Sequence, residues 1–358
     1  MNGKLSFLSA AFLAFAAGNA YAEDKASKPV IDENGVVHVP AFELPSSELS
    51  SPEAQAFMKF RAKRPLNLPT MEPDIAKSRK ALEAMLAPQV AEMLKAYPVD
   101  VAEQKISGVP TRVVTPKGKN VDPARVLINL HGGAFNTCWE SCSVLESAPI
   151  ASVGGYKVVS INYRMAPEAA HPAGVEDVAT VYRELLKSYT AKHIGIYGCS
   201  AGGSLAGQAA AWLPAHDLPQ AAAIGIFGAG AVRFNTGDSA YIAGYVDGSF
   251  PPPAKPGEAK MDMTRGYFAK ADMSDAFVSP ALHPEVLKKF PPTLIITGTR
   301  AMDMSPAIYT NSQLLKAGRR STLVVGEAMG HCYFYSPQLP ESRDAYDVIV
   351  RFFRENLH

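Results

Sequence analysis

Ser200 is the residue whose surroundings most clearly suggest chemistry. It lies in the segment GCSAG at residues 198–202, which fits the pattern G-x-S-x-G. An apolar run at 194–197 leads into this segment, and a helix-forming run at 201–211 follows it. A strand, a tight turn with small flanking residues and a helix form a nucleophile elbow, which holds the serine at the positive end of the helix. We therefore predict that Ser200 is a nucleophile; the alternative is a glycine-rich helix start without chemistry.

His331 is the candidate base for this serine. A serine hydroxyl is a poor nucleophile until a base takes its proton, and that base is usually a histidine oriented by a carboxylate. His331 follows an apolar run at 322–325, in a loop where a strand is expected to end. The later His358 is the final residue of the sequence, and chain ends fray. We therefore expect His331 to act as the base.

A glycine-rich segment, HGGA at 131–134, follows another apolar run at 126–130. Ligands of open parallel sheets bind at the carboxyl ends of the strands. Glycines in such a loop let backbone N–H groups approach a substrate oxygen and stabilise an oxyanion. We interpret the segment as an oxyanion hole rather than an ordinary turn. His131 precedes the loop, so we expect it to shape the turn and not to act as a base.

Three segments occur in a recognisable order: HGGAF at 131–135, YRMAPE at 163–168 and GCSAGG at 198–203. Together they resemble the hormone-sensitive-lipase-like family of α/β-hydrolase esterases, over roughly residues 75–357. The resemblance implies that Gly133, Ala134 and Ala201 donate the oxyanion N–H groups. The common family motif is HGGG, so Ala134 is a departure that keeps the N–H and narrows the pocket slightly. Arg164 and Glu168 are interpreted as an internal ion pair that braces the loop.

The resemblance also indicates where the orienting acid belongs. The family places an aspartate just after the strand expected at 293–297, directly following an arginine. After Arg300 that position is Ala301, and the nearest carboxylate is Asp303, two residues later. A loop can shift by two residues and still aim a carboxylate at His331, so we favour Asp303. The alternative acid is Glu327, four residues before the base.

Alternating elements must position these residues. Short apolar runs lie at 126–130, 158–161, 194–197, 222–227, 293–297 and 322–325, and helical patterns lie at 175–189, 201–212, 307–316 and 342–357. This alternation predicts an α/β class protein with a mainly parallel sheet and helices on both faces. It agrees with the α/β-hydrolase fold and helical cap of the resembling family. A further helix is expected at 74–97, kinked or split by Pro88.

The domain organisation starts with a signal-peptide pattern at residues 1–22. Lys4, an apolar run at 5–17 and the segment AYA at 20–22 predict cleavage before Glu23 and a secreted or periplasmic protein. An uncleaved membrane anchor is the alternative; after cleavage we expect no stable membrane insertion. We then expect a leader at 23–55, N-terminal cap helices at 56–104 and a hydrolase domain at 105–358. A cap insertion is expected at about 234–290.

Composition limits the possible partners. The 358 residues carry 35 basic and 34 acidic side chains, without the basic excess of a nucleic-acid-binding protein. No cysteine spacing or short motif typical of a metal or nucleotide site occurs. We therefore expect no metal, no cofactor and no nucleic acid, and a small-molecule ester as the partner. The oligomeric state stays open.

The four cysteines form two candidate pairs. Cys138 and Cys142 could form a disulfide in an exported protein, or remain two buried thiols. Cys199 and Cys332 flank the nucleophile and the base, so they should lie close together. We expect this second pair not to bond, because a crosslink there could displace Ser200.

The resemblance implies hydrolysis of short-chain acyl esters through an acyl-enzyme on Ser200. One alternative is a non-catalytic small-molecule-binding protein on the same fold, which the presence of His331 argues against. Another is a lactonase or amidase that uses the same residues, which the sequence does not separate from an esterase.

Overall fold

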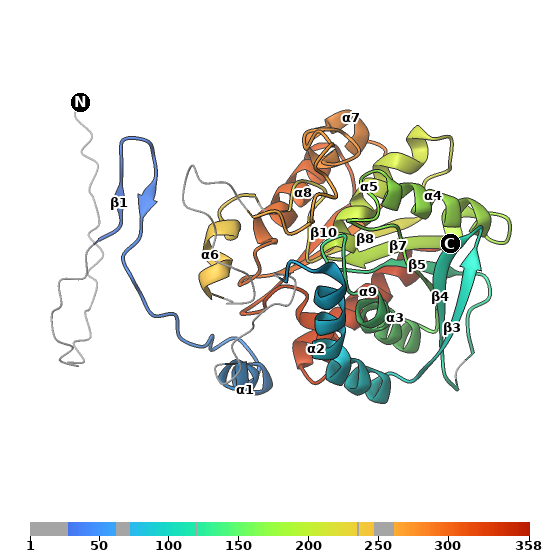
Figure 1. The fold of residues 1–358 in the computed structure, drawn as a ribbon, viewed down its shortest axis with the longest axis horizontal. Coiled ribbons are helices and arrows are strands. Elements are labelled where there is room, and N and C mark those ends of the chain that lie inside the picture. The colour runs from blue at the N-terminus through green and yellow to red at the C-terminus, as the bar shows by residue number, and fades with distance from the viewer. Residues whose placement is uncertain (1–27, 62–71, 119, 235, 247–260) are drawn as a thin grey trace, which may run out of the picture. The chain divides into compact units, whose positions relative to one another are not determined.

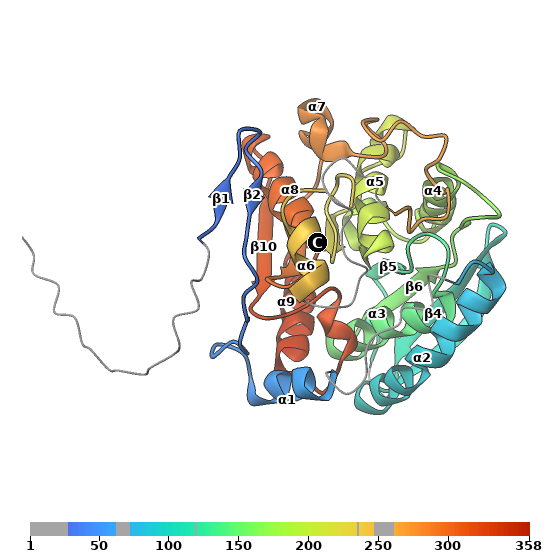
Figure 2. The ribbon, with the colours of Figure 1, turned by 60° about the vertical axis from the view of Figure 1, so that its left-hand side comes forward.

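An eight-stranded sheet forms the core of residues 46–358 (Figures 1 and 2). The computed structural model describes residues 28–61, 72–118, 120–234, 236–246 and 261–358. The expected signal peptide lies outside the described residues, as do positions 235 and 247–260 of the expected cap insertion. The chain divides into two units, Met1–Pro45 and Ser46–His358. In the first unit, β1 (Val30–Ile31) pairs antiparallel with β2 (Val37–His38).

The strand order of the central sheet is β10-β9-β8-β7-β5-β6-β4-β3. Neighbours from β10 to β6 pair in parallel, whereas β4 is antiparallel to both β6 and β3. The strands are β3 (Val99–Ile106), β4 (Val109–Pro116), β5 (Val126–Leu130), β6 (Lys157–Ile161), β7 (Ile194–Cys199), β8 (Ala223–Phe227), β9 (Thr293–Gly298) and β10 (Ser321–Gly326). This mainly parallel sheet agrees with the expected fold class.

The hairpin of β3 and β4 differs from the sequence expectation, which placed cap helices as far as residue 104. The two strands join at Ser107 and Gly108, whose φ angles of 48° and 86° are left-handed. Most of β3 is exposed because it lies at the edge of the sheet. An exposed edge strand needs no apolar run, so the pattern that marks the buried strands is missing from it.

Helices cover both faces of the sheet: α4, α5 and α8 lie on one face, and α3 and α9 on the other, with α2 outside α3 (Figure 1). The helices are α1 (Pro52–Arg61), α2 (Ile75–Ala96), α3 (Trp139–Gly154), α4 (Ala173–Leu185), α5 (Ala201–Ala215), α6 (Ser239–Val246), α7 (Pro284–Leu287), α8 (Met304–Lys316) and α9 (Pro340–Asn356). Helix α2 begins at the cap Asp74, whose side chain accepts the N–H groups of Ala76 and Lys77. It continues through Pro88 as one helix, so of the expected kink or split, the split does not occur.

The core lies in two apolar layers on either side of the sheet. Every residue of β5, β7, β8 and β9 is buried, as expected for parallel strands covered on both faces. Burying one large aliphatic side chain contributes roughly 1.5–3 kcal/mol, so these layers hold the strand ends rigidly. Among the described residues, no helix is both long and apolar enough to cross a membrane.

The parallel strands bring the predicted residues to one edge of the sheet. His131 follows β5, Ser200 follows β7, Asp303 follows β9 and His331 follows β10. All four therefore come from the carboxyl ends of the strands, which is where sites form in open α/β sheets.

Candidate active site

Ser200 occupies a strained turn between β7 and α5. Its φ and ψ are 58° and −121°, in a region that side-chain-bearing residues rarely adopt. Its N–H donates to the carbonyl of Phe227 at 2.8 Å, which fixes the turn against β8. A Cβ at Gly202 would overlap the carbonyl oxygen of Leu130 on β5. Glycine is therefore required two residues after the serine, as the elbow motif predicts.

Asp303 and His331 form a direct hydrogen bond. The His331 Nδ1–H donates to Asp303 Oδ1 at 2.6 Å. The other carboxylate oxygen, Oδ2, accepts the hydroxyl of Thr297 at 2.6 Å. Asp303 is fully buried, whereas the His331 side chain is 12% exposed. The carboxylate is thus held by two donors and orients the imidazole, which remains slightly exposed.

Glu327, the alternative acid, lies elsewhere. It is exposed, and its Oε1 accepts the hydroxyl of Ser47 at 2.8 Å. The structure brings Asp303 to His331 although Ala301 fills the usual position. Asp303 is the residue directly before α8, and a hydrogen bond from the Ala301 N–H to the Gly298 carbonyl turns the chain sharply after β9. This turn accounts for the two-residue shift.

The loop after β5, residues 131–137, contains the predicted oxyanion segment and is called the oxyanion loop; it is held by its own backbone. The Gly133 carbonyl accepts the N–H groups of Asn136 and Thr137, both at 3.0 Å. The Asn136 side-chain amide donates to the Ala134 carbonyl at 2.7 Å. Gly133 and Ala134 have φ angles of 108° and 52°. The carbonyls of Gly133 and Ala134 therefore accept hydrogen bonds from within the loop. Among the described residues, no acceptor takes the N–H of Gly133 or Ala134.

His131 lies beneath the loop rather than in it. The side chain is fully buried, and its Nδ1–H donates to the Gly132 carbonyl at 2.7 Å. Its ring stacks on Tyr163 with centroids 4.5 Å apart. Burial lowers its pKa to about 4, which keeps the ring neutral. This arrangement agrees with the expected role in shaping the turn.

Comparison with known proteins decides the family. The model of the alpha/beta hydrolase fold family matches residues 127–335, which is more than half of the chain. The protein belongs to the α/β-hydrolase fold family. Among the residues of this hydrolase that the structure describes, no group of three or more His, Cys, Asp or Glu side chains is placed to hold a metal ion.

Esterases are prominent among the relatives of this hydrolase. An acetyl-hydrolase of Streptomyces hygroscopicus is 30% identical over 239 residues, covering 64% of this chain and 75% of that protein. The crystal structure of esterase E25 has a TM-score of 0.79 and 28% identity, covering 91% of this chain and 100% of that one. An esterase from the bacterial hormone-sensitive lipase family has a TM-score of 0.71 and 25% identity, covering 86% and 99%. The expected relationship to hormone-sensitive-lipase-like esterases is confirmed.

The expected ion pair of Arg164 with Glu168 is wrong. Arg164 Nε donates to Asp177 Oδ1 at 2.9 Å, and its Nη2 donates to Glu176 at 3.0 Å. Both carboxylates lie near the start of α4. Arg164 and Glu168 are only four residues apart in the sequence, but α4 places two other carboxylates within hydrogen-bond distance of Arg164.

Arg79 of α2 is the partner of Glu168 instead, and no motif or spacing around Arg79 indicated this role. It donates to both Glu168 oxygens at 2.7 and 2.8 Å and lowers the pKa of that carboxyl through these hydrogen bonds. The same guanidinium donates to the carbonyls of Asn136 and Ala166. Arg79 therefore ties α2 to the oxyanion loop.

Both cysteine pairs are disulfides. Cys138 bonds to Cys142 with their Cα atoms 5.3 Å apart, and the left-handed φ of 73° at Cys138 supplies the irregular turn that the expected bond requires. Cys199 also bonds to Cys332, with Cα atoms 6.5 Å apart, so the expectation of an unbonded pair is wrong. A Cβ at Gly228 would lie within 3.2 Å of both sulfurs and of His331 Cε1. The crosslink therefore joins the elbow to the base loop, and its Cys332 sulfur lies 3.6 Å from His331 Nε2.

The two disulfides are expected to contribute unequally to stability. They close loops with sequence separations of 133 and 4 residues. In the chain-entropy model, removal of the Cys199–Cys332 bond costs roughly 4–5 kcal/mol of unfolding free energy, against about 2 kcal/mol for Cys138–Cys142. Urea unfolding of the two double alanine variants measures the difference. Equal losses, or alkylation of any of the four thiols in an unreduced digest, would contradict this assignment.

Proposed function

We propose that this hydrolase is a carboxylesterase in which Ser200 is the nucleophile, His331 the base and Asp303 the orienting acid. The hydrogen bond from His331 Nδ1–H to the buried Asp303 carboxylate carries the proposal, because it leaves Nε2 as the basic nitrogen. Nε2 takes the Ser200 proton as the hydroxyl attacks the ester carbonyl, and returns it to the departing alcohol. Water then hydrolyses the acyl-enzyme by the same route.

The oxyanion in this proposal is stabilised by backbone N–H groups of Gly133, Ala134 and Ala201. Ala201 is the first residue of α5, so its N–H points outward at the positive end of the helix. The hydrogen bonds that fix the Gly133 and Ala134 carbonyls support a preorganised loop. Each such donor typically contributes about 2.7–4 kcal/mol to the transition state.

We further propose that the acyl group of the substrate is short. The Phe234 ring lies 5.5 Å from the His331 ring, and Ala134 carries a methyl group where the common family motif has a glycine. An acetyl-hydrolase is among the relatives. These observations favour small acyl groups beside the base.

The experiment that tests this function is an assay of purified protein with p-nitrophenyl esters from acetyl to palmitoyl. The value of kcat/KM is expected to be highest at acetyl or butyryl and to fall at least tenfold by decanoyl. A matched lactone and anilide report on the alternative substrate classes. Hydrolysis of the anilide or lactone alone, or a maximum at palmitoyl, would overturn the proposed substrate class.

The proposed location is the periplasm or the extracellular space. Two disulfides support it, because such bonds persist in oxidising compartments. N-terminal sequencing of protein from fractionated cells is expected to give a mature chain that begins at Glu23. Recovery of the uncleaved chain from the cytosol would refute the proposed location.

A further inference from the structure

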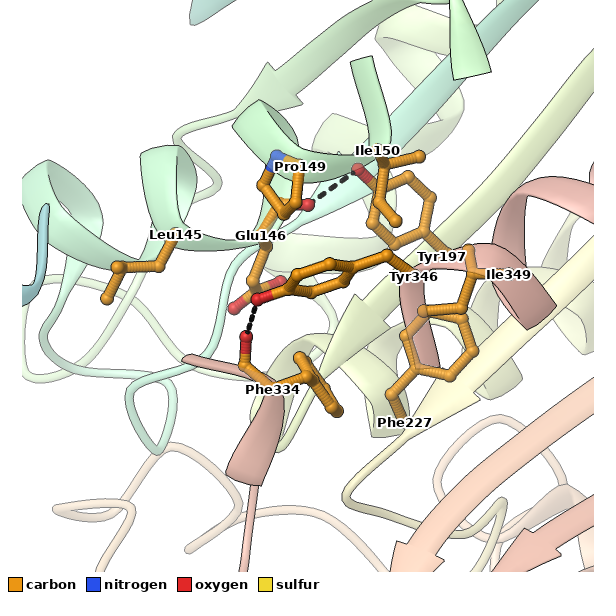
Figure 3. A pocket seen from close by; sticks show the side chains of 9 residues that line it. All are labelled: Leu145, Glu146, Pro149, Ile150, Tyr197, Phe227, Phe334, Tyr346 and Ile349. Carbon is orange, nitrogen blue, oxygen red and sulfur yellow. Dashed lines mark hydrogen bonds between the residues drawn. The ribbon is translucent and has the colours of Figure 1, made fainter. Parts of the chain in front are cut away.

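A buried carboxylate lies behind the proposed site and takes no part in the mechanism above. Glu146 is on α3, 3% exposed, and it lines a small cavity under the sheet together with apolar and aromatic side chains (Figure 3). Figure 3 also shows the hydroxyl of Tyr197 donating to the Glu146 backbone carbonyl, which fixes the helix turn that carries the carboxylate.

Four donors surround the Glu146 carboxylate. Oε1 accepts the Gly132 N–H at 2.8 Å and the Tyr335 hydroxyl at 2.5 Å. Oε2 accepts the Asn129 side-chain amide at 2.8 Å and the Cys199 N–H at 3.2 Å. Two backbone N–H groups and the NH₂ group of Asn129 can only donate and cannot accept a hydrogen bond from a protonated carboxyl, so these partners match the ionised carboxylate.

Three of these donors belong to the segments that form the proposed site. Gly132 directly precedes the oxyanion residue Gly133, Cys199 directly precedes Ser200, and Tyr335 lies four residues after His331. One side chain therefore connects the oxyanion loop, the nucleophile elbow and the base loop. A Cβ at Gly132 would lie 3.1 Å from the Tyr335 hydroxyl, which shows how closely two of these segments approach.

We propose that Glu146 is a positioning residue that holds these three segments in their reactive arrangement when its carboxylate is ionised. The proposal rests on the function proposed above, since the segments are those that carry Ser200, His331 and the oxyanion N–H groups. Protonation removes an acceptor from this shell, which loosens the connection between the loops and lowers kcat.

The surroundings of Glu146 make this protonation accessible near neutral pH. Burial raises the pKa of the carboxyl to about 7, although the hydrogen bonds from Tyr335, Asn129, Gly132 and Cys199 oppose the rise. Its ionisable neighbours are neutral, since burial raises the pKa of each tyrosine and lowers that of the histidine. They are His131 after β5, Tyr163 after β6, Tyr197 on β7, Tyr335 after β10 and Tyr346 on α9.

The sign of the pH effect follows from the raised pKa. The folded protein binds a proton at Glu146 up to about pH 7, whereas the unfolded chain releases it near the ordinary value of about 4.3. The stability that this group contributes is therefore fully present below that ordinary value and is lost as pH rises to about 7. Activity changes in the opposite direction, because the ionised form orders the loops.

Two variants and a matched control test the proposal through the pH profile of kcat/KM for p-nitrophenyl acetate. Tyr335→Phe removes one donor to Glu146, and is expected to move the acid limb upward by about one pH unit. Glu146→Gln is expected to lower kcat by about tenfold or more at pH 8, with KM nearly unchanged. Tyr333→Phe removes a neighbouring hydroxyl that makes no hydrogen bond to Glu146 in the described structure, and should leave the limb in place.

The combined variant separates positioning from general destabilisation. In the Glu146→Gln background, Tyr335→Phe is expected to cause no further shift of the acid limb. A shift that persists there, or a wild-type profile and kcat in folded Glu146→Gln, would overturn the proposal. If Glu146→Gln does not fold, the carbonyl band of a protonated carboxyl, followed by infrared spectroscopy with ¹³C-labelled glutamate, must still titrate at higher pH in Tyr335→Phe than in the wild type. An unshifted band overturns the proposal.

The infrared measurement also distinguishes failure of this proposal from failure of the proposed function. It requires no turnover, so it can be made on a Ser200→Ala variant. Hydrolysis that survives Ser200→Ala would reject the proposed nucleophile. A Glu146 carbonyl band that titrates at the same pH in Tyr335→Phe as in the wild type would reject the positioning role alone.

Discussion

Replacement of Ser200 by alanine is expected to lower kcat for p-nitrophenyl acetate by about 10⁶-fold, the size of loss found when a serine hydrolase loses its catalytic serine. The reason is that no acyl-enzyme forms without the hydroxyl, while the oxyanion N–H groups remain and give only residual catalysis. Alanine keeps the Cβ that the backbone at φ 58° already accommodates. The fold should therefore survive, and circular dichroism and the melting temperature check it.

Ser204→Ala is the matched control for this experiment. Ser204 lies one helical turn further along α5, and its backbone N–H donates to the Ser200 carbonyl at 3.0 Å. Its activity should stay within about twofold of the wild type, because surface and helix substitutions of this size change little. More than a few per cent of wild-type kcat in folded Ser200→Ala would refute the nucleophile assignment.

The parts of the fold that could be predicted were those with a local signal. The buried strands that precede Ser200 and the oxyanion loop are mainly apolar runs, because parallel strands are covered on both faces. The edge strand β3 is exposed and has no such run. Helix α3 was also missed; it is buried nearly all round, so it lacks the polar face that marks an amphipathic helix.

The site residues could be predicted from the sequence where each one follows a recognisable strand, as Ser200, Asp303 and His331 do. What the sequence could not supply were partners brought in from distant elements. Arg79 reaches Glu168 across 89 residues, and Cys199 reaches Cys332 across 133. Glu146 sits in the middle of α3 with no motif around it, and its contacts become visible only when three loops converge. A motif records spacing along the chain, whereas these contacts depend on how the sheet orders its strands.

Asp303→Asn is expected to lower kcat by roughly 10⁴-fold, the loss found when a buried triad aspartate becomes an amide. Asp303 is fully buried and takes both the His331 Nδ1–H and the Thr297 hydroxyl. An asparagine that keeps its oxygen toward Thr297 turns its NH₂ toward His331, which then holds the imidazole in the tautomer whose Nε2 carries the proton. Such a ring cannot accept the Ser200 proton. Steady-state kinetics with p-nitrophenyl acetate, on protein whose melting curve shows a folded state, measures the loss.

Glu327→Gln is the matched control, since it makes the same change of carboxylate to amide at the alternative acid. Glu327 is exposed and bonded to Ser47, and the substituted amide can still accept that hydroxyl, so kcat should stay within about twofold of the wild type. A severe loss in Glu327→Gln together with a mild one in Asp303→Asn would transfer the role to the glutamate. That outcome would require the loop after β10 to rearrange when substrate binds, because the described structure places His331 against Asp303 with the Thr297 hydroxyl behind it.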